Sequence, residues 1–100
     1  WSAYQMPHDL LFVKRFAVYP DRAHGEVAAF NYSVWYPNQE RLPAVELEPI
    51  GPANEIPPAG EAAFTEHWFL LASQFPKRGG PLDLAGLERR ILDECPVKAP

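Results

Sequence analysis

The hydrophobic and polar positions along this 100-residue sequence mark three long stretches as candidate strands. Residues 10–18, LLFVKRFAV, are largely apolar on both faces, which predicts a strand that is covered on both sides. Residues 26–36 predict a second strand with one heavily aromatic face, and residues 61–72 predict a third. The period of two is that of a β-strand, in which successive side chains point to opposite faces.

A shorter strand is predicted at residues 44–48, AVELE. Its period of two would point Val45 and Leu47 to one face and Glu46 and Glu48 to the other. This strand is therefore expected to bury one apolar face and to present two carboxylates on the opposite face.

The segments around these strands carry residues that break regular structure. Pro7 predicts an irregular stretch over residues 1–9, and four prolines keep residues 49–60 irregular. The chain has 12 prolines in 100 residues, against a typical share of about 5%. This richness favours β structure with many turns.

The pattern changes after Gly79 and Gly80 to the spacing of an amphipathic helix. Asp83 can cap the first turn by accepting hydrogen bonds from backbone N–H groups, and Pro96 ends the helix. The predicted apolar stripe consists of Leu84, Leu87, Ile91 and Cys95.

The order of strands first and helix last predicts an all-β fold, an antiparallel β-sandwich with a short C-terminal helix packed at its edge. A parallel α/β fold would need helices between the strands, and the sequence predicts none there. A chain of this length buries one core, so residues 1–100 are predicted to form a single domain.

The charge balance and the cysteine count narrow the classes of partner. Nine Lys and Arg against 13 Asp and Glu give a net charge of −4 without a basic face, so no nucleic-acid partner is predicted. No apolar run approaches the roughly 20 residues that cross a bilayer, so no membrane partner is predicted. Cys95 is the single cysteine, which excludes an intrachain disulfide and leaves the localisation open.

Glu48 is the candidate catalytic residue. A carboxylate on a half-covered sheet face, near Tyr and Trp side chains, suits a general base, because partial burial makes a carboxylate a better proton acceptor. The alternative is that Glu46 and Glu48 are ordinary solvated strand residues, and the alternating pattern alone favours that alternative.

The aromatic side chains have two interpretations. Their flat faces can stack on the C–H faces of sugars, but an aromatic stripe at a period of two is more often part of a core. Most of Tyr32, Trp35, Tyr36 and Trp68 are therefore expected in the core, with one or two at a ligand surface. The candidate substrate-binding residues are Trp35, Tyr36, Glu46, His67 and Trp68.

Histidines and basic residues add little to the predicted site. His67 could contact a sugar or a metal, but a strand histidine with a local hydrogen-bond partner is the favoured interpretation. The three histidines, at 8, 24 and 67, share no ligand spacing, so no metal site and no cofactor are predicted. Lys14 and Arg15 are expected at the surface, where they could also contact an acidic sugar.

The stretch from Ala44 to Trp68 resembles the closing strands of the galactose-mutarotase-like (aldose 1-epimerase) superfamily. The similarity extends over roughly residues 9–72. The segments that carry it are Val45-Glu46-Leu47-Glu48, which matches a hydrophobic-Leu-Glu motif; Pro52 and Asn54, which follow it; Pro58-Ala59-Gly60-Glu61, which matches a Pro-Gly-Glu turn with Ala59 added; and the aromatic strand at 65–70.

The resemblance implies a carbohydrate-handling protein of partial supersandwich architecture, with anomer interconversion as the parent activity. In that family a glutamate takes the proton of the anomeric hydroxyl and a histidine protonates the ring oxygen. By position Glu48 would be the glutamate. The family's histidine comes from a strand well upstream, which neither His8 nor His24 matches, so the acid is expected to be missing.

Three interpretations remain open at this point. The chain could be an isomerase-like piece, the C-terminal segment of a longer mutarotase-like protein. It could be a non-catalytic β-sandwich that binds carbohydrate or a protein partner. It could also be one segment of a processed or multi-chain protein whose active site is completed elsewhere. A partner chain or a homo-oligomer is left open.

Overall fold

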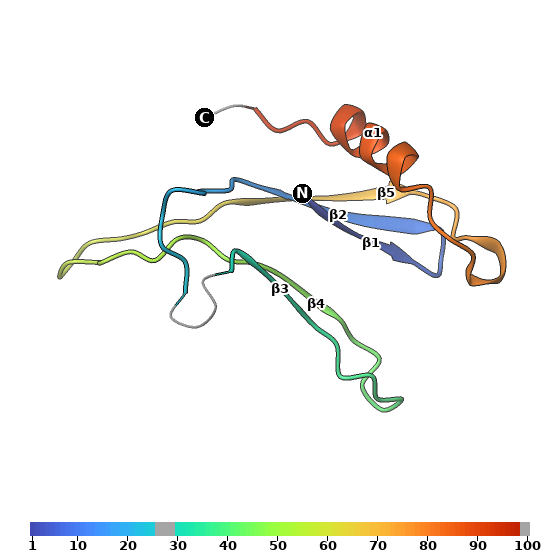
Figure 1. The fold of residues 1–100 in the computed structure, drawn as a ribbon, viewed down its shortest axis with the longest axis horizontal. Helices are drawn as coiled ribbons and strands as arrows, with labels where there is room; N and C mark the ends of the chain where they lie inside the picture. The colour runs from blue at the N-terminus through green and yellow to red at the C-terminus, as the bar shows by residue number, and fades with distance from the viewer. Residues whose placement is uncertain (26–29, 99–100) are drawn as a thin grey trace. The chain divides into compact units, whose positions relative to one another are not determined.

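The computed structural model describes residues 1–25 and 30–98. The chain forms two compact units. The sheet–helix unit comprises Trp1–Phe16 and Glu66–Pro100, and the ribbon unit comprises Ala17–Thr65. Within the described ranges, the strands number five and form two antiparallel sheets, and one short α-helix lies near the C-terminus (Figure 1).

The sheet–helix unit contains three antiparallel strands in the order β1-β2-β5. These are β1 (Ser2–Met6), β2 (Leu10–Phe16) and β5 (Glu66–Ala72). The predicted strand at 10–18 is confirmed as β2, which lies in the middle of the sheet. The predicted strand at 61–72 is found only over its second half.

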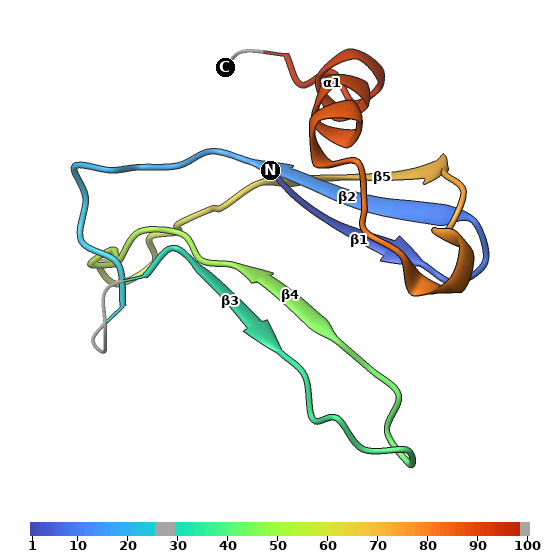
Figure 2. The ribbon, with the colours of Figure 1, turned by 45° about the vertical axis from the view of Figure 1, so that its right-hand side comes forward.

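Helix α1 (Leu84–Glu94) lies over one face of this sheet (Figures 1 and 2). The core between them is small: Leu11 and Val13 of β2 are buried against Ile91 and Cys95. These four side chains are at most 1% exposed. They are the residues that fix the helix on the sheet.

The predicted helix and its cap are confirmed, with one correction. Oδ1 of Asp83 accepts a hydrogen bond from the backbone N of Gly86 at 3.0 Å, and the helix ends before Pro96. Leu84 was expected in the apolar stripe, but it is 69% exposed. The helix packs against the core only from Leu87 onward, one turn after Leu84.

The irregular stretch predicted at residues 1–9 is wrong. Ser2–Met6 forms β1 because it pairs with β2, in a register that places Ala3 opposite Val13. Pro7 falls in the turn between the two strands, where it breaks no ladder. Asp9 closes this turn with a positive φ of 57°, and its carbonyl oxygen accepts from the backbone N of Ser73 at 2.9 Å.

The ribbon unit is built on two short strands, β3 (Tyr32–Trp35) and β4 (Glu46–Pro49), which pair antiparallel (Figure 2). The strand predicted at 26–36 is therefore found only at 32–35, and residues 26–29 lie outside the described residues. The predicted strand at 44–48 corresponds to β4. Its burial alternates as expected, with Leu47 half-buried and both glutamates exposed.

Loops around the ribbon are tied together by hydrogen bonds. The backbone N of Ala53 donates to the carbonyl oxygen of Ala23 at 2.8 Å, and Nη2 of Arg22 donates to Oδ1 of Asn54 at 2.6 Å. His24 is buried beside them, with Nδ1 at 2.9 Å from the carbonyl oxygen of Arg22. These contacts hold the proline-rich segment after β4 to the loop before β3.

The ribbon unit is inserted between two paired strands. Phe16, the last residue of β2, is the cross-strand partner of Glu66, the first residue of β5. The chain therefore leaves the sheet and returns to it at adjacent positions. Of the helices in the described ranges, none has the length and apolar character of a membrane span.

Candidate functional site

The register of the ribbon brings three of the predicted site residues together. Trp35 is the cross-strand partner of Glu46, and Ser33 is the partner of Glu48. Because cross-strand partners share a face and side chains alternate along each strand, Trp35, Glu46 and Glu48 lie on one face. Trp35 is 44% exposed, and both carboxylates are exposed.

The partial burial expected for Glu48 is wrong. Its side chain is exposed, and among the described residues it forms no hydrogen bond or ion pair. The physical reason is the width of the ribbon. A two-stranded sheet cannot cover its own faces, so a residue on either face stays open unless another element packs on it.

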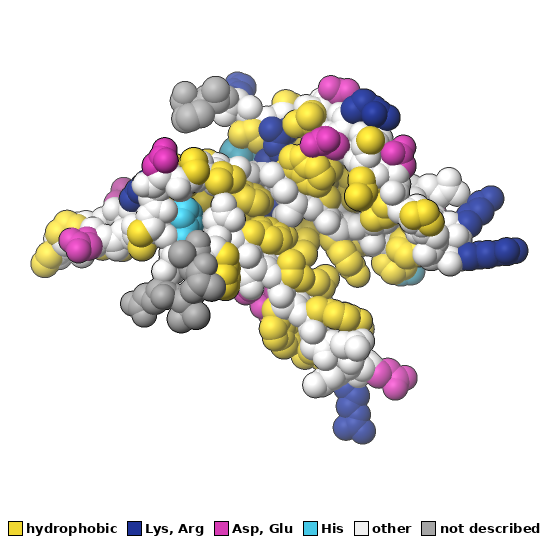
Figure 3. Space-filling model, viewed as in Figure 1, with side chains coloured by type: hydrophobic (Ala, Val, Ile, Leu, Met, Phe, Trp, Pro, Cys, Tyr) yellow, Lys and Arg dark blue, Asp and Glu magenta, His cyan; other side chains and the backbone are white. Residues whose placement is uncertain are grey.

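Tyr36 follows directly after β3 and is 63% exposed. Its hydroxyl donates to Oδ1 of Asn38 at 3.1 Å, so the ring is held near the start of the β3–β4 loop. Strand alternation would direct Tyr36 to the face opposite Trp35. Hydrophobic side chains are visible along this ribbon in Figure 3.

The other two predicted residues belong to the sheet–helix unit. His67 and Trp68 are neighbours on β5, so they point to opposite faces of that sheet. His67 is the cross-strand partner of Arg15 in the sheet register, and its side chain is exposed. The predicted substrate-binding set is thus divided between the two units.

Most of the aromatic residues were expected in the core, and this is wrong. Trp35, Tyr36 and Trp68 are all exposed, and Tyr32 is half-buried. Within the sheet–helix unit, α1 covers only the face that carries Leu11 and Val13. Among the residues of this unit that the structure describes, no helix covers the face that carries Trp68.

Trp68 is the most organised of the exposed aromatic residues. It is 65% exposed, yet its Nε1 donates to Oε2 of Glu66 at 2.7 Å. Its ring meets the ring of Phe12 edge to face, with centroids 5.6 Å apart and planes at 89°. Nζ of Lys14 lies 4.8 Å from the centroid of the indole.

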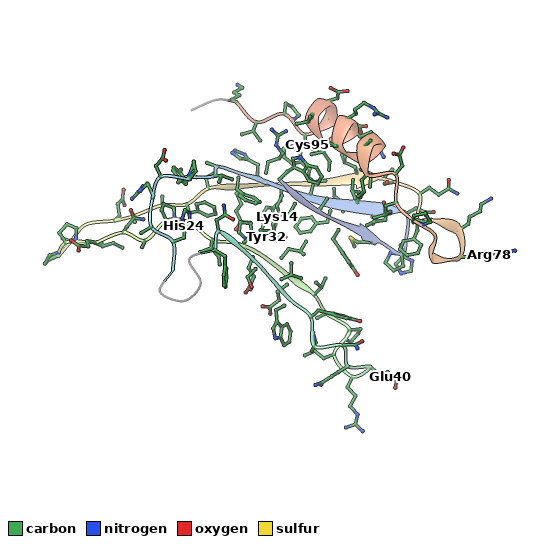
Figure 4. The ribbon with its side chains drawn as sticks, viewed as in Figure 1. Lys14, His24, Tyr32, Glu40, Arg78 and Cys95 are labelled. Carbon is green, nitrogen blue, oxygen red and sulfur yellow. The ribbon has the colours of Figure 1, made fainter. Side chains whose placement is uncertain are left out.

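Lys14 and Glu66 complete this cluster. Nζ of Lys14 lies 3.0 Å from Oε2 of Glu66, and both side chains are largely covered, at 11% and 24% exposed. Lys14 lies on the side of the sheet away from Cys95 (Figure 4). We call Phe12, Lys14, Glu66 and Trp68 the Trp68 platform.

The electrostatics of the platform favour a charged Glu66. Partial burial acts to raise the pKa of Glu66, but the hydrogen bonds from Trp68 and Lys14 and the positive charge of Lys14 outweigh it. The pKa of Glu66 is therefore held below its ordinary value of 4.5. The ion pair is formed at neutral pH, and it fixes the carboxylate that in turn holds the indole.

Sequence reasoning selected Trp68 but missed its three supports. Lys14 is the cross-strand partner of Trp68, and Phe12 is the partner of Leu70. Only the pairing of β2 with β5 in this register brings these side chains together. The polar Lys14 within an apolar strand was the signal, because a buried lysine ammonium group needs a carboxylate nearby.

No three His, Cys, Asp or Glu side chains gather to hold a metal ion in the part of the chain that the structure describes. Comparison with protein-family models, with curated proteins and with solved structures finds no match.

Proposed function

We propose that this chain binds carbohydrate, and that the Trp68 platform is the binding surface. The observation that carries the proposal is an indole that is 65% exposed and yet held by Glu66, Lys14 and Phe12. An exposed ring that is fixed before binding loses less conformational freedom when a ligand arrives. The apolar C–H face of a pyranose can stack on such a ring.

The charged pair beside the ring suits the hydroxyl rim of a sugar. Glu66 can accept a hydrogen bond from a hydroxyl, and Lys14 can donate one. Because the two charges are paired with each other, the site has no net charge that would select a charged sugar over a neutral one. An aromatic ring beside paired polar groups is the arrangement expected for an amphipathic ligand.

The test is a titration of the full chain with D-glucose, D-galactose and their β-linked disaccharides. Binding is monitored through the NMR signal of the indole N–H of Trp68. Saturable shifts are expected, and Trp68→Ala should weaken binding about tenfold, a stacking contribution on the order of 1–2 kcal/mol. Trp1→Ala is the matched control and should leave the affinity unchanged. Equal losses in both variants, or no saturable shift with any sugar, would contradict the proposal.

A second candidate is anomer interconversion with Glu48 as the base. It is supported by the resemblance of residues 45–48 to the aldose 1-epimerase motif and by the shared face of Trp35, Glu46 and Glu48. The exposed carboxylate is free to take a proton from an anomeric hydroxyl. In this mechanism solvent water protonates the ring oxygen as its bond to C1 breaks, and the C1–C2 bond then rotates. Closure reverses both proton transfers and gives the other anomer.

Polarimetry on freshly dissolved α-D-glucose or α-D-galactose tests this second candidate. Glu48→Gln should abolish any acceleration of mutarotation by the protein while leaving its stability unchanged. Glu40→Gln, which removes an exposed carboxylate of the β3–β4 loop, is the matched control. Unchanged turnover in Glu48→Gln would remove this residue from the mechanism.

The mutarotase-like candidate also implies a fold. In that fold the two sheets would be the two layers of a β-sandwich. The support is that both sheets are antiparallel and that each has an apolar face. Nuclear Overhauser contacts between side chains of β3 or β4 and side chains of β5 are expected in that case. Their absence in a fully assigned spectrum would leave two separate units.

A further inference from the structure

β5 is an edge strand of the three-stranded sheet, because it pairs with β2 on one side only. Its sequence, EHWFLLA, is mostly apolar and contains neither lysine nor proline, the residues that commonly protect a sheet edge. Trp68 is 65% exposed and Leu70 is 60% exposed. An uncovered apolar edge of this kind is a template for pairing with another strand.

The register shows which backbone groups of β5 face outward. The backbone N of Ser73 donates to the carbonyl oxygen of Asp9 at 2.9 Å, a bond that continues the ladder beyond the pair of Leu10 and Ala72. Backbone groups of an antiparallel strand point alternately to its two sides. Those of residues 67, 69 and 71 therefore face β2, and those of residues 66, 68, 70 and 72 face the open edge.

Arg90 closes one end of this edge. Its Nη2 donates to the carbonyl oxygen of Ala72 at 3.0 Å, so that outward acceptor is already used. The outward N–H and C=O groups of Trp68 and Leu70 form no hydrogen bond within the described residues. These free groups lie symmetrically on either side of Phe69.

We propose that β5 pairs antiparallel with β5 of a second copy of this chain, about a two-fold axis at Phe69. In this register Trp68 of each copy exchanges two backbone hydrogen bonds with Leu70 of the other, so the free groups of both residues are all used. A second copy fits because the edge is self-complementary, as a two-fold interface requires. The sheet would grow from three strands to six.

The side chains favour this register over its neighbours. The indole of Trp68 lies opposite Leu70 of the second copy on the same face, an aromatic–aliphatic pair that occurs twice. A shift by two residues in one direction would place the carboxylate of Glu66 opposite Leu70, which removes water from a charge beside an apolar group. The opposite shift would pair Trp68 with Ala72, whose carbonyl oxygen Arg90 already occupies.

This inference goes beyond the proposed function and does not depend on it. A sugar would stack on the flat face of the Trp68 ring, whereas strand pairing uses the backbone edge of β5. Each can therefore be present without the other.

The first test is sedimentation velocity of the full chain over a series of concentrations. A species of twice 11.3 kDa is expected to increase with concentration. Leu70→Lys should weaken the dimer about tenfold or more, because two apolar cross-strand pairs are lost and two ammonium groups enter the edge. Leu84→Lys is the matched control and should leave the dimer unchanged, because Leu84 is 69% exposed on α1, outside β5.

Amide hydrogen exchange locates the contact. The N–H groups of Trp68 and Leu70 should become protected as the dimer forms, whereas those of Phe69 and Leu71, which face β2, should be protected at every concentration. Leu70→Pro removes an outward N–H, a change that an edge strand tolerates, and it should also weaken the dimer. Leu70→Lys decides the matter if Leu70→Pro does not fold.

Three outcomes would overturn this inference. One is a monomer at every concentration, and another is a dimer of equal affinity in Leu70→Lys and Leu84→Lys. The third is protection of Trp68 and Leu70 that does not change with concentration, because another segment of the same chain would then cover the edge. Sugar binding by a monomer would overturn only the dimer, and a dimer without sugar binding would overturn only the proposed function.

Discussion

Nη1 of Arg15 donates a hydrogen bond to the carbonyl oxygen of Cys95 at 2.8 Å, although the two residues are 80 positions apart in the sequence. Arg15 belongs to β2 and Cys95 caps the C-terminal end of α1. This bond ties the end of the helix to the central strand, beside the buried side chains of Ile91 and Cys95.

Arg15→Met is expected to destabilise the chain by about 1–2 kcal/mol, because a hydrogen bond with a charged donor is lost while the alkyl stem is kept. Urea unfolding followed by circular dichroism measures the change. Lys77→Met is the control, since Lys77 is exposed in the 3₁₀ turn Lys77–Gly79. Equal midpoints for the two variants would show that the bond contributes nothing.

The small core should depend heavily on Ile91. Ile91→Ala is expected to cost about 2–5 kcal/mol, because Ile91 is fully buried and its truncation leaves a cavity. Leu84→Ala, on the same helix, should cost little because Leu84 is 69% exposed. Thermal or urea unfolding of both variants checks this, and a similar loss in both would contradict the observed packing of α1.

The ion pair of the Trp68 platform should make stability depend on pH. The pKa of Glu66 is lowered in the folded chain, so its contribution is fully present above the unfolded value and is lost as the pH falls through the folded pKa. The stability difference between wild type and Glu66→Gln is therefore expected to be constant from neutral pH down to about 4.5 and to shrink below it.

Unfolding free energies from pH 7 downward measure this difference. Glu61→Gln is the control, since Glu61 is exposed in the irregular segment before β5. The indole signal of Trp68 should change over the same acid range, because protonation of Glu66 weakens the bond from Nε1. A difference that grows toward acid pH would show that the sign of the shift is wrong.

Gly51 is required where the segment after β4 passes Phe64. A Cβ atom at Gly51 would lie 2.9 Å from the nearest ring atom of Phe64. Gly51→Ala is therefore expected to destabilise the chain by about 1–3 kcal/mol. Gly80→Ala, whose added Cβ would meet no atom closer than 3.4 Å, should be neutral or slightly stabilising. Chemical denaturation of both variants decides this, and equal effects would count against the close contact.

Local patterns predicted the elements whose structure is decided by neighbouring residues. The cap at Asp83 and the alternation through Glu46, Leu47 and Glu48 follow from residues a few positions apart, and both are confirmed. β1 was missed because its strand conformation comes from pairing with β2. No period within residues 1–9 contains that information.

Burial was predicted less well than strand character. Trp35 and Trp68 sit at the alternating positions expected of strands, but a sequence does not state which face another element covers. The supports of Trp68 were missed for the same reason, since Lys14 and Glu66 are far apart in the chain and meet only through the register of β2 with β5.

Because Phe16 and Glu66 are cross-strand partners, residues 17–65 form a cassette, an insertion whose removal would leave β2 and β5 side by side. Paired residues lie about 5 Å apart, a gap that an Asn-Gly turn spans. A shortened chain in which Asn-Gly replaces the cassette should keep the β2–β5 register and the contact of Arg15 with Cys95, as amide exchange and NMR would report. The same junction would then accept foreign loops, so β2 and β5 would serve as a graft site for engineered binding segments.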